Sequence, residues 1–356
     1  MKSRLLVLFL VVGVASSAFA DWTYYPLAES SSLITDLTPS GSYAAGFQGS
    51  NYFRWSVGGG FELVTGGSHS GGNAYISADG QYIAGEALDG SGNRFGARYS
   101  FTSTSWTLAP HPDGYGHLGV NYSSMWGMDD SGDVVALAAY DSNTRYKPVS
   151  YTYSTNMLGL NATQGATYHA RPNDMSGDGT TIVGWDQVSG RNAAAWRDGI
   201  EVYFDAGVPG EIYGTNTDGS LHFGFRNNLP AWWDNDFVPT TLGLPAGFDR
   251  GGVASGTDDG SMMVGYAQVG TSTTTRRAVI WIDETPQLLS DWAAAHGMTF
   301  PDVIASGIDI TPDGGTIAGW RLDGSQKGFI MQIPEPGTLI AFGMVFATLA
   351  VSNRRR

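Results

Sequence analysis

A short phrase occurs seven times between Ile34 and Met331, and this repetition constrains the fold more than any other feature of the chain. Each copy has a turn built on a glycine, usually Asp-Gly, followed by a β-prone run that closes on a small residue. The turn glycines, separated by 39, 52, 47, 40, 41 and 54 residues, are Gly41, Gly80, Gly132, Gly179, Gly219, Gly260 and Gly314. A period in the forties made of strands and turns is typical of propeller blades. The sequence therefore predicts an all-β, seven-bladed β-propeller.

The chemistry of each copy supports this interpretation. The turn aspartate can hydrogen-bond its own backbone, and the glycine after it accepts a positive φ without steric cost. The closing glycine, such as Gly46 or Gly85, suits a place where strands approach closely. Copies three and five are degenerate, with Leu137 at the closing position and His222 in the strand. A partner strand follows each copy, and the rings or large side chains expected to fill the space between blades are Trp55, Tyr99, Tyr151, Trp196, Trp233, Trp281 and Met331.

Two segments lie outside the simple repeat. The seventh copy stops after Gln332 without the third strand seen in other copies, at residues 60–64 and 199–203. The unassigned strand-like segment 22–27 is predicted to complete that last blade, because ring closure protects sheet edges. An insertion after the sixth copy is predicted to be helical, with Thr285 as cap, Pro286 at the first helical position and Gly297 after the end.

Composition excludes several classes of protein. The chain has 50 glycines and 15% charged residues, while 42% of its residues are hydrophobic, which suits a turn-rich folded protein. The absence of cysteine excludes disulfides and thiolate chemistry. The formal charge is −14. Without the five basic residues of segments 1–20 and 337–356, 14 basic residues stand against 33 acidic residues, a net charge of −19. Such a body repels nucleic acid and anionic membranes.

Both termini have the features of protein-sorting signals. Residues 1–20 have a basic start, an apolar stretch and the small residues Ala18 and Ala20 at a cleavage site, which predicts a secretory signal peptide. At the other end an apolar stretch of 15 residues lies between two polar elements, which predicts a single, transient membrane helix. Those elements are Pro334, Glu335 and Pro336 before it and Arg354, Arg355 and Arg356 after it.

This tail, residues 333–356, closely resembles the PEP-CTERM sorting signal of exported bacterial proteins. The resemblance implies processing by exosortase after signal peptidase, transient anchoring in the inner membrane, and release to the cell surface or extracellular matrix, often with exopolysaccharide. The body, residues 21–332, is similar to exported propeller-type repeat proteins in phrases such as residues 308–320. That second resemblance covers residues 34–331 and implies no known activity.

Motifs of catalysis and metal binding are weak. The chain shows no Gly-x-Ser-x-Gly elbow, zinc helix or phosphate loop, and no distinctive acid pair outside the turn aspartates, so no catalytic residue is predicted. Segment 111–117, which holds two histidines, is expected to be a solvated loop rather than a metal site. Calcium is the one cofactor considered, at residues 173–179 and at Asp129-Asp130, but neither segment has the terminal bidentate glutamate, and turn chemistry explains the same residues.

Aromatic residues just past the closing position are the best ligand candidates. Their rings could stack on sugars if they faced one mouth of the propeller; the alternative is packing between blades. The five rings are Phe47, Trp185, Phe225, Tyr266 and Trp320. The sequence thus predicts a non-catalytic surface or matrix protein that binds polysaccharide or another surface protein. A secreted glycan lyase or hydrolase and a purely structural coat component are the alternatives, because a fold alone does not select among them.

Overall fold

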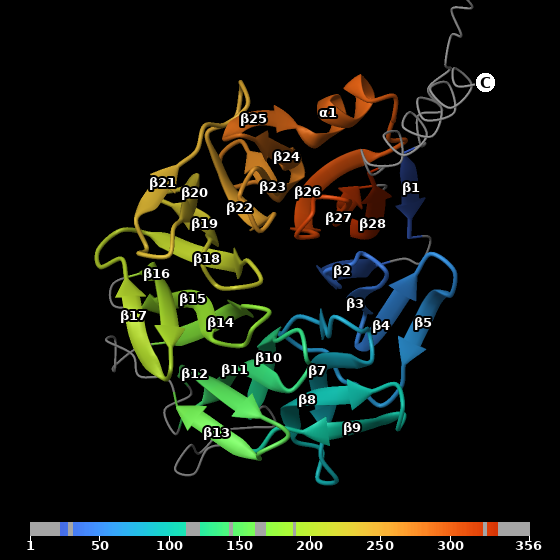
Figure 1. The fold of residues 1–356 in the computed structure, drawn as a ribbon, viewed down its shortest axis with the longest axis vertical. Coiled ribbons are helices and arrows are strands. Elements are labelled where there is room, and N and C mark those ends of the chain that lie inside the picture. The colour runs from blue at the N-terminus through green and yellow to red at the C-terminus, as the bar shows by residue number, and fades with distance from the viewer. Residues whose placement is uncertain are drawn as a thin grey trace, which may run out of the picture. The chain divides into compact units, whose positions relative to one another are not determined.

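The computed structural model describes residues 22–27, 31–111, 122–141, 145–160, 169–187, 190–322 and 326–333. The compact unit Thr23–Ile333 consists of seven four-stranded antiparallel sheets arranged in a ring (Figure 1). The predicted seven-bladed β-propeller is therefore confirmed. The predicted signal peptide and sorting tail lie outside the described residues. Among the helices that are described, none combines the length and apolar character needed to cross a bilayer.

The blades are numbered in chain order. Blade 1 contains β2 (Ser32–Leu37), β3 (Ala44–Gln48), β4 (Asn51–Ser56) and β5 (Gly60–Val64). Blade 2 contains β6 (Tyr75–Ile76), β7 (Tyr82–Leu88), β8 (Arg94–Ser100) and β9 (Ser105–Leu108). Blade 3 contains β10 (Ser123–Met128), β11 (Val134–Tyr140), β12 (Tyr146–Thr152) and β13 (Met157–Leu160). Blade 4 contains β14 (Ala170–Met175), β15 (Thr181–Gln187), β16 (Arg191–Arg197) and β17 (Ile200–Phe204).

The remaining blades follow the same order. Blade 5 contains β18 (Gly210–Thr215), β19 (His222–Arg226), β20 (Leu229–Trp233) and β21 (Pro239–Thr241). Blade 6 contains β22 (Arg250–Gly256), β23 (Met262–Gln268), the short 3₁₀ helix η1 (Thr273–Thr275), β24 (Arg277–Ile282) and β25 (Thr285–Leu288), and the helix α1 (Leu289–Ala295) follows it. Blade 7 contains β26 (Val303–Ile310), β27 (Thr316–Leu322), β28 (Gln326–Gln332) and β1 (Thr23–Pro26).

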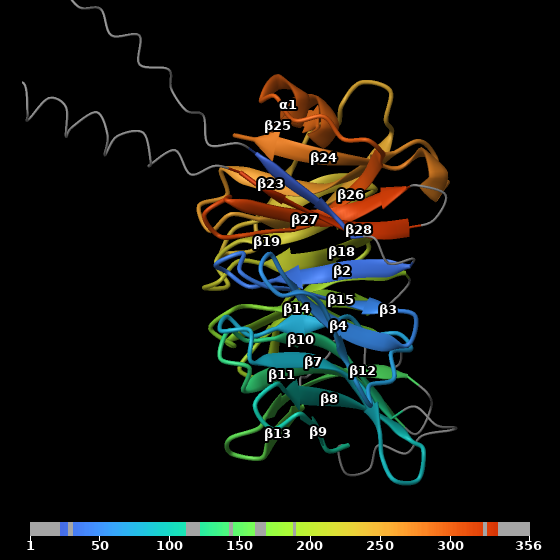
Figure 2. The same ribbon diagram turned by 90° about the vertical axis from the view of Figure 1, so that its right-hand side faces the viewer.

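The ring closes as the sequence predicts. Strand β1 pairs antiparallel with β28, from Thr23 opposite Gln332 to Pro26 opposite Phe329. The first strand of each blade is innermost, and each of these strands contacts the innermost strand of the next blade, including β26 with β2. Figure 2 shows the sheets stacked face to face in side view. The first and last segments of the propeller therefore share one blade.

The seven turns are built alike. Each turn glycine has a positive φ, from 66° to 75°, the conformation that glycine accepts most readily. Its N–H donates to the carbonyl three residues earlier, as Gly80 does to Ser77 at 2.8 Å. The aspartate before the glycine also acts locally, because Asp79 Oδ1 accepts the Gln81 N–H at 2.9 Å. The predicted turn chemistry is confirmed.

Packing between strands explains the closing glycine and the large side chains. A Cβ added to Gly184 would lie 2.1 Å from the carbonyl oxygen of Arg171 on the neighbouring innermost strand, so only glycine allows this approach. The aromatic ends of the third strands are buried, with Trp196, Trp233 and Trp281 at most 1% exposed. Burial of such rings contributes much of the stability of a sheet protein.

One predicted element is partly wrong. The helix after copy six begins at Leu289 rather than at Pro286, and residues 285–288 form β25, the outer strand of blade 6. Thr285 pairs with Ile282 and therefore does not cap the helix. Hairpin pairing with the open edge of β24, across a two-residue turn at 283–284 with positive φ, outweighs the capping signal at Thr285.

Candidate functional site

A cavity of about 380 Å³ lies between the innermost strands, and all seven blades contribute to its lining. Its two ends differ in the chain segments that form them. The turn end lies beside the seven glycine turns, where innermost strands lead into second strands. The loop end lies at the opposite ends of these strands, where second strands lead into third strands. Sites in propeller-like and barrel-like folds commonly lie at such openings.

Equivalent residues from the blades meet inside this channel. We call the residue five positions before each turn glycine the channel position. In six blades it follows a β-bulge in the innermost strand, and such bulges reorient side chains next to functional sites. The residues at the channel position, in blade order, are Asp36, Tyr75, Gly127, Asp174, Gly214, Ser255 and Asp309.

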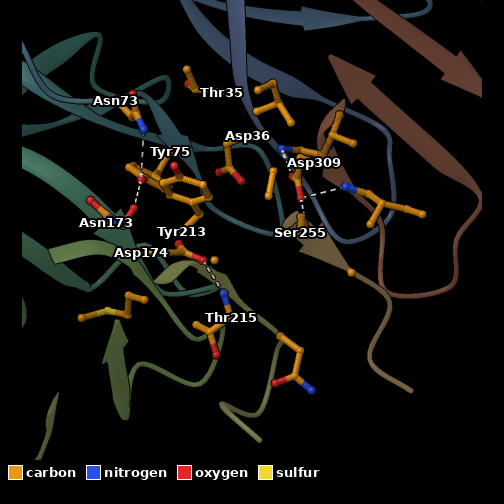
Figure 3. A pocket seen from close by; sticks show the side chains of 18 of the residues that line it. Thr35, Asp36, Asn73, Tyr75, Asn173, Asp174, Tyr213, Thr215, Ser255 and Asp309 are labelled. Carbon is orange, nitrogen blue, oxygen red and sulfur yellow. Dashed lines mark hydrogen bonds between the residues drawn. The ribbon is translucent and has the colours of Figure 1, made fainter. Parts of the chain in front are cut away.

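The three aspartates at this position, called the channel carboxyls, connect neighbouring blades. Asp36 accepts the Ile76 N–H of blade 2 at 2.6 Å, Asp174 accepts the Thr215 N–H of blade 5 at 2.9 Å, and Asp309 accepts the Leu37 N–H of blade 1 at 2.8 Å. In each pair the donor is the residue after the channel position of the next blade. The same chemistry is therefore used three times around the ring, and Figure 3 shows the three carboxyls in the pocket.

Asp309 has the most partners. It also accepts the Ser255 hydroxyl of blade 6 at 2.7 Å and the N–H of Ile310 at 2.8 Å. The Asp36 carboxyl lies close enough for each of the two groups to influence the pKa of the other. The sequence shows no distinctive acid pair outside the turn aspartates, and this pair forms only because closure of the ring brings Asp36 of the first copy to Asp309 of the last.

Burial changes the ionisation of the channel carboxyls. Burial, and then the charge of Asp309, raise the pKa of Asp36 well above its ordinary value. Burial also raises the pKa of Asp174 to about 8 and that of Asp309 to about 6. Carboxyls that are poorly solvated and close to one another favour the protonated form. A protonated Asp36 can donate to an ionised Asp309, which satisfies both groups.

We expect the substitution Asp174→Asn to reduce the loss of stability at rising pH. The raised pKa means that the folded protein binds more protons than the unfolded chain between about pH 4 and 8, so the free energy of unfolding falls as pH rises through this window. Asparagine keeps an acceptor for Thr215 and cannot ionise. The stability difference should grow in favour of the variant by up to about 1.4 kcal/mol per pH unit between pH 6 and 8, measured by denaturant unfolding.

A turn aspartate provides the matched control. Hydrogen bonds from Thr311 and from the Gly315 N–H lower the pKa of Asp313, so it stays ionised in folded and unfolded chains throughout pH 6–8. Asp313→Asn should therefore shift stability by an amount that does not change over this range. A pH-independent difference for Asp174→Asn as well would show that Asp174 does not titrate in the folded protein.

The loop end of the cavity combines arginines with aromatic rings. The guanidinium of Arg171 lies 3.8 Å from the ring centroid of Trp126, and that of Arg276 lies 4.0 Å from the ring centroid of Tyr266. Both are within the range of a cation–π contact. The Tyr213 and Tyr266 hydroxyls are 3.3 Å apart. We call Trp126, Arg171, Tyr213, Tyr266, Arg276 and Trp320, all of which line the cavity, the loop-end cluster.

Only part of the predicted set of aromatic residues reaches this cluster. Tyr266 and Trp320 line the cavity, and the Trp320 indole N–H donates to the Ile34 carbonyl of blade 1 at 2.9 Å. The other three rings pack against neighbours. Phe47 stacks on His69 at 3.7 Å, Trp185 is 3% exposed, and Phe225 lies 5.5 Å from Tyr213.

Whether a ring lines the cavity or packs against neighbours depends on the residue that pairs with it on the innermost strand. Tyr266 pairs with Gly252 and Trp320 with Ser306, and these small residues leave the rings open to the channel. The partners of the other three rings are larger: Phe47 pairs with Leu33, Trp185 with Arg171 and Phe225 with Glu211. The sequence of a single strand does not show which residues pair across the sheet. Sequence reasoning therefore also missed Trp126, Tyr213 and the two arginines of the loop-end cluster. A small residue opposite each ring is the signal that could have found the open positions.

The segments considered for metal binding have local roles. Asp178 Oδ1 accepts the Thr180 N–H and the Ser176 hydroxyl, and Asp129 Oδ1 accepts the N–H groups of Asp133 and Val134. His111 lies near Tyr122, whereas residues 112–117 fall outside the described chain. Among the residues that the structure describes, no three His, Asp or Glu side chains are placed to hold a metal ion.

Comparisons with known proteins agree on the fold. Neither a protein-family model nor a curated protein sequence matches the chain. Among solved structures, oligogalacturonate lyase from Vibrio parahaemolyticus is 13% identical with a TM-score of 0.56, over 89% of this chain and 99% of that one. An oligogalacturonate lyase in complex with manganese is similar at 13% identity and a TM-score of 0.56, over 88% and 96% of the two chains. U3-55K reaches a TM-score of 0.54 at 14% identity, over 87% and 98%. At such identities these likenesses show a shared propeller fold.

Proposed function

We propose that this chain is an exported, non-catalytic β-propeller of the cell surface or extracellular matrix that binds polysaccharide at the loop end of its channel. Signal peptidase and exosortase would process the two termini. The single observation that carries the binding proposal is the loop-end cluster, in which partly exposed Trp126, Tyr266 and Trp320 line one cavity beside arginines. Aromatic faces next to a few polar groups are typical of small-molecule and sugar sites.

The cavity suits a short stretch of sugar chain. Its volume of about 380 Å³ is within the range of ligand pockets, and it is open at the surface. The aromatic rings are held in place by their neighbours, because Tyr266 lies between Tyr213 and Arg276 and Trp126 donates to Ser124. Rings that are already ordered lose little entropy when a ligand stacks on them.

A glycan-cleaving enzyme is the main alternative, and the pair formed by Asp36 and Asp309 is the feature that favours it, because such enzymes use two carboxyls. Both carboxyls are engaged by backbone N–H groups of the following blades. The two carboxyls also act on each other's ionisation, whereas the two carboxyls of a glycosidase stand on either side of the bond that is cleaved. This geometry favours a structural role for the pair.

We expect Trp126→Ala to weaken polysaccharide binding by at least about tenfold, because losing one stacking contact of about 1.4 kcal/mol has that effect. Binding of the mature protein to a glycan array, followed by affinity measurements on the strongest hit, gives the comparison. Trp106→Ala is a matched control, since Trp106 packs against Tyr52 and Tyr99 away from the cavity.

The results separate the three functions. Binding that Trp126→Ala reduces and Trp106→Ala preserves supports the proposal. Release of reducing ends or unsaturated products from the same glycans would establish an enzyme instead. An array without any bound glycan would favour a coat component.

A further inference from the structure

We infer that the loop-end cluster recognises acidic polysaccharide, with Arg276 as the residue that binds a sugar carboxylate. This inference rests on the proposed function and adds the charge class of the ligand. It is drawn from the placement of the arginines in an otherwise acidic chain of formal charge −14. An acidic surface repels anions, so a positively charged opening selects where an anionic chain can bind.

Arg276 is the cation best placed for this role. It lines the cavity directly after η1, and its guanidinium lies over the Tyr266 ring at 4.0 Å. Its Nε and Nη2 donate to Gln268 Oε1, a neutral acceptor, at 3.2 and 3.1 Å. Within the described chain, Arg276 forms no ion pair at 4.0 Å or less, so its charge is available to a ligand.

Two further arginines add positive charge at the loop end. Arg171 and Arg191 share one carboxylate, Glu211, each at 3.1 Å, and Glu211 is 4% exposed. Two cations against one buried anion leave one positive charge beside Trp126 and Tyr213. A planar guanidinium can bind a carboxylate through two parallel hydrogen bonds, which adds geometric selectivity to the attraction.

The two ends of the channel differ in charge. At the loop end, the described parts of the connections between second and third strands and the starts of the third strands carry five arginines and two acids, namely Arg94, Arg145, Arg191, Arg276 and Arg277 beside Asp89 and Asp141. The glycine turns at the other end carry no basic residue, and their acids include Asp79, Asp178, Asp218, Asp259 and Asp313. Asp130 and Asp258 line the cavity near the turn end. A sugar chain with carboxylates is therefore attracted to the loop end and repelled from the turn end.

The test compares two forms of one polymer. Polygalacturonate and its fully methyl-esterified form present the same sugar faces, and only the first carries charge. We expect the mature protein to bind polygalacturonate at least about tenfold more tightly, because hydrogen bonds to charged groups are the stronger ones. Arg276→Gln should remove most of this preference. Arg277→Gln is the matched control, since Arg277 has the same charge one residue later, lies outside the cavity lining and donates to the Thr274 and Arg276 carbonyls.

Each outcome separates the inference from the proposed function. Equal binding of the two polymers, lowered by Trp126→Ala, would retain the sugar site and overturn the charge selectivity. Equal losses in Arg276→Gln and Arg277→Gln would show that general attraction to the surface acts in place of a specific carboxylate contact. Binding of neither polymer, together with an empty glycan array, would overturn the proposed function itself.

Discussion

Removing residues 21–28 is expected to lower the melting temperature of the propeller by about 10 °C or more. The deletion takes away β1, which supplies the fourth strand of blade 7. It also removes Leu27, which is 3% exposed and whose carbonyl accepts Arg321 Nη2 at 2.7 Å, and Tyr24, whose ring lies 5.0 Å from Phe300. Loss of these contacts is expected to cost about 5 kcal/mol, at roughly 2 °C per kcal/mol for a domain of this size.

The deletion also exposes the edge of β28, so the shortened protein should self-associate more readily. Melting followed by circular dichroism and sedimentation at several concentrations would measure both effects. A synthetic peptide of residues 21–28, added in excess, should recover part of the lost melting temperature, because a ligand that binds the folded state stabilises it. A melting curve that does not change on deletion would mean that ring closure does not depend on β1.

Much of the fold could be predicted from the sequence because its causes are local and recur. An aspartate that bonds to its own turn, followed by a glycine with positive φ, fixes each hairpin without any distant partner. Seven repeats of this unit imply seven blades. Because the seventh copy lacks a strand, another segment of the chain must supply it. The helix was misplaced because two local signals compete at the same residues. Residues 285–288 pair with β24 across the two-residue turn Asp283-Glu284, and this hairpin outweighs the capping pattern at Thr285.

Sequence reasoning missed the channel because residues far apart in the sequence form it. The channel position holds aspartate in three blades only, so it shows no regular repeat. Asp36 and Asp309 lie at opposite ends of the repeat region and meet because the ring closes. The loop-end cluster depends in the same way on small partners opposite Tyr266 and Trp320 and on inner-strand residues such as Arg171. Sites of this kind become visible once strand pairing and ring order are known.

Replacing Asp309 by alanine is expected to destabilise the propeller by about 4 kcal/mol. The carboxylate accepts hydrogen bonds from Leu37 of blade 1, Ser255 of blade 6 and Ile310 of its own blade, so its loss leaves three donors without their acceptor. Each buried donor left unpaired costs about 1–3 kcal/mol. Water that enters the adjacent cavity can satisfy some of these donors, which limits the total. Denaturant unfolding at pH 7 would measure the change.

Two further variants identify the cause of this loss. Asp309→Asn keeps one acceptor oxygen and nearly the same volume, so its loss should be smaller than that of alanine if hydrogen bonds between blades matter more than packing. Ser255→Ala removes the blade 6 donor together with one partner of the carboxylate, and the double variant with Asp309→Ala should be less destabilised than the sum of the two single changes. Strict additivity would indicate that blades 6 and 7 are not coupled through this bond, and an unchanged stability of Asp309→Ala would mean that the channel carboxyls do not hold neighbouring blades together.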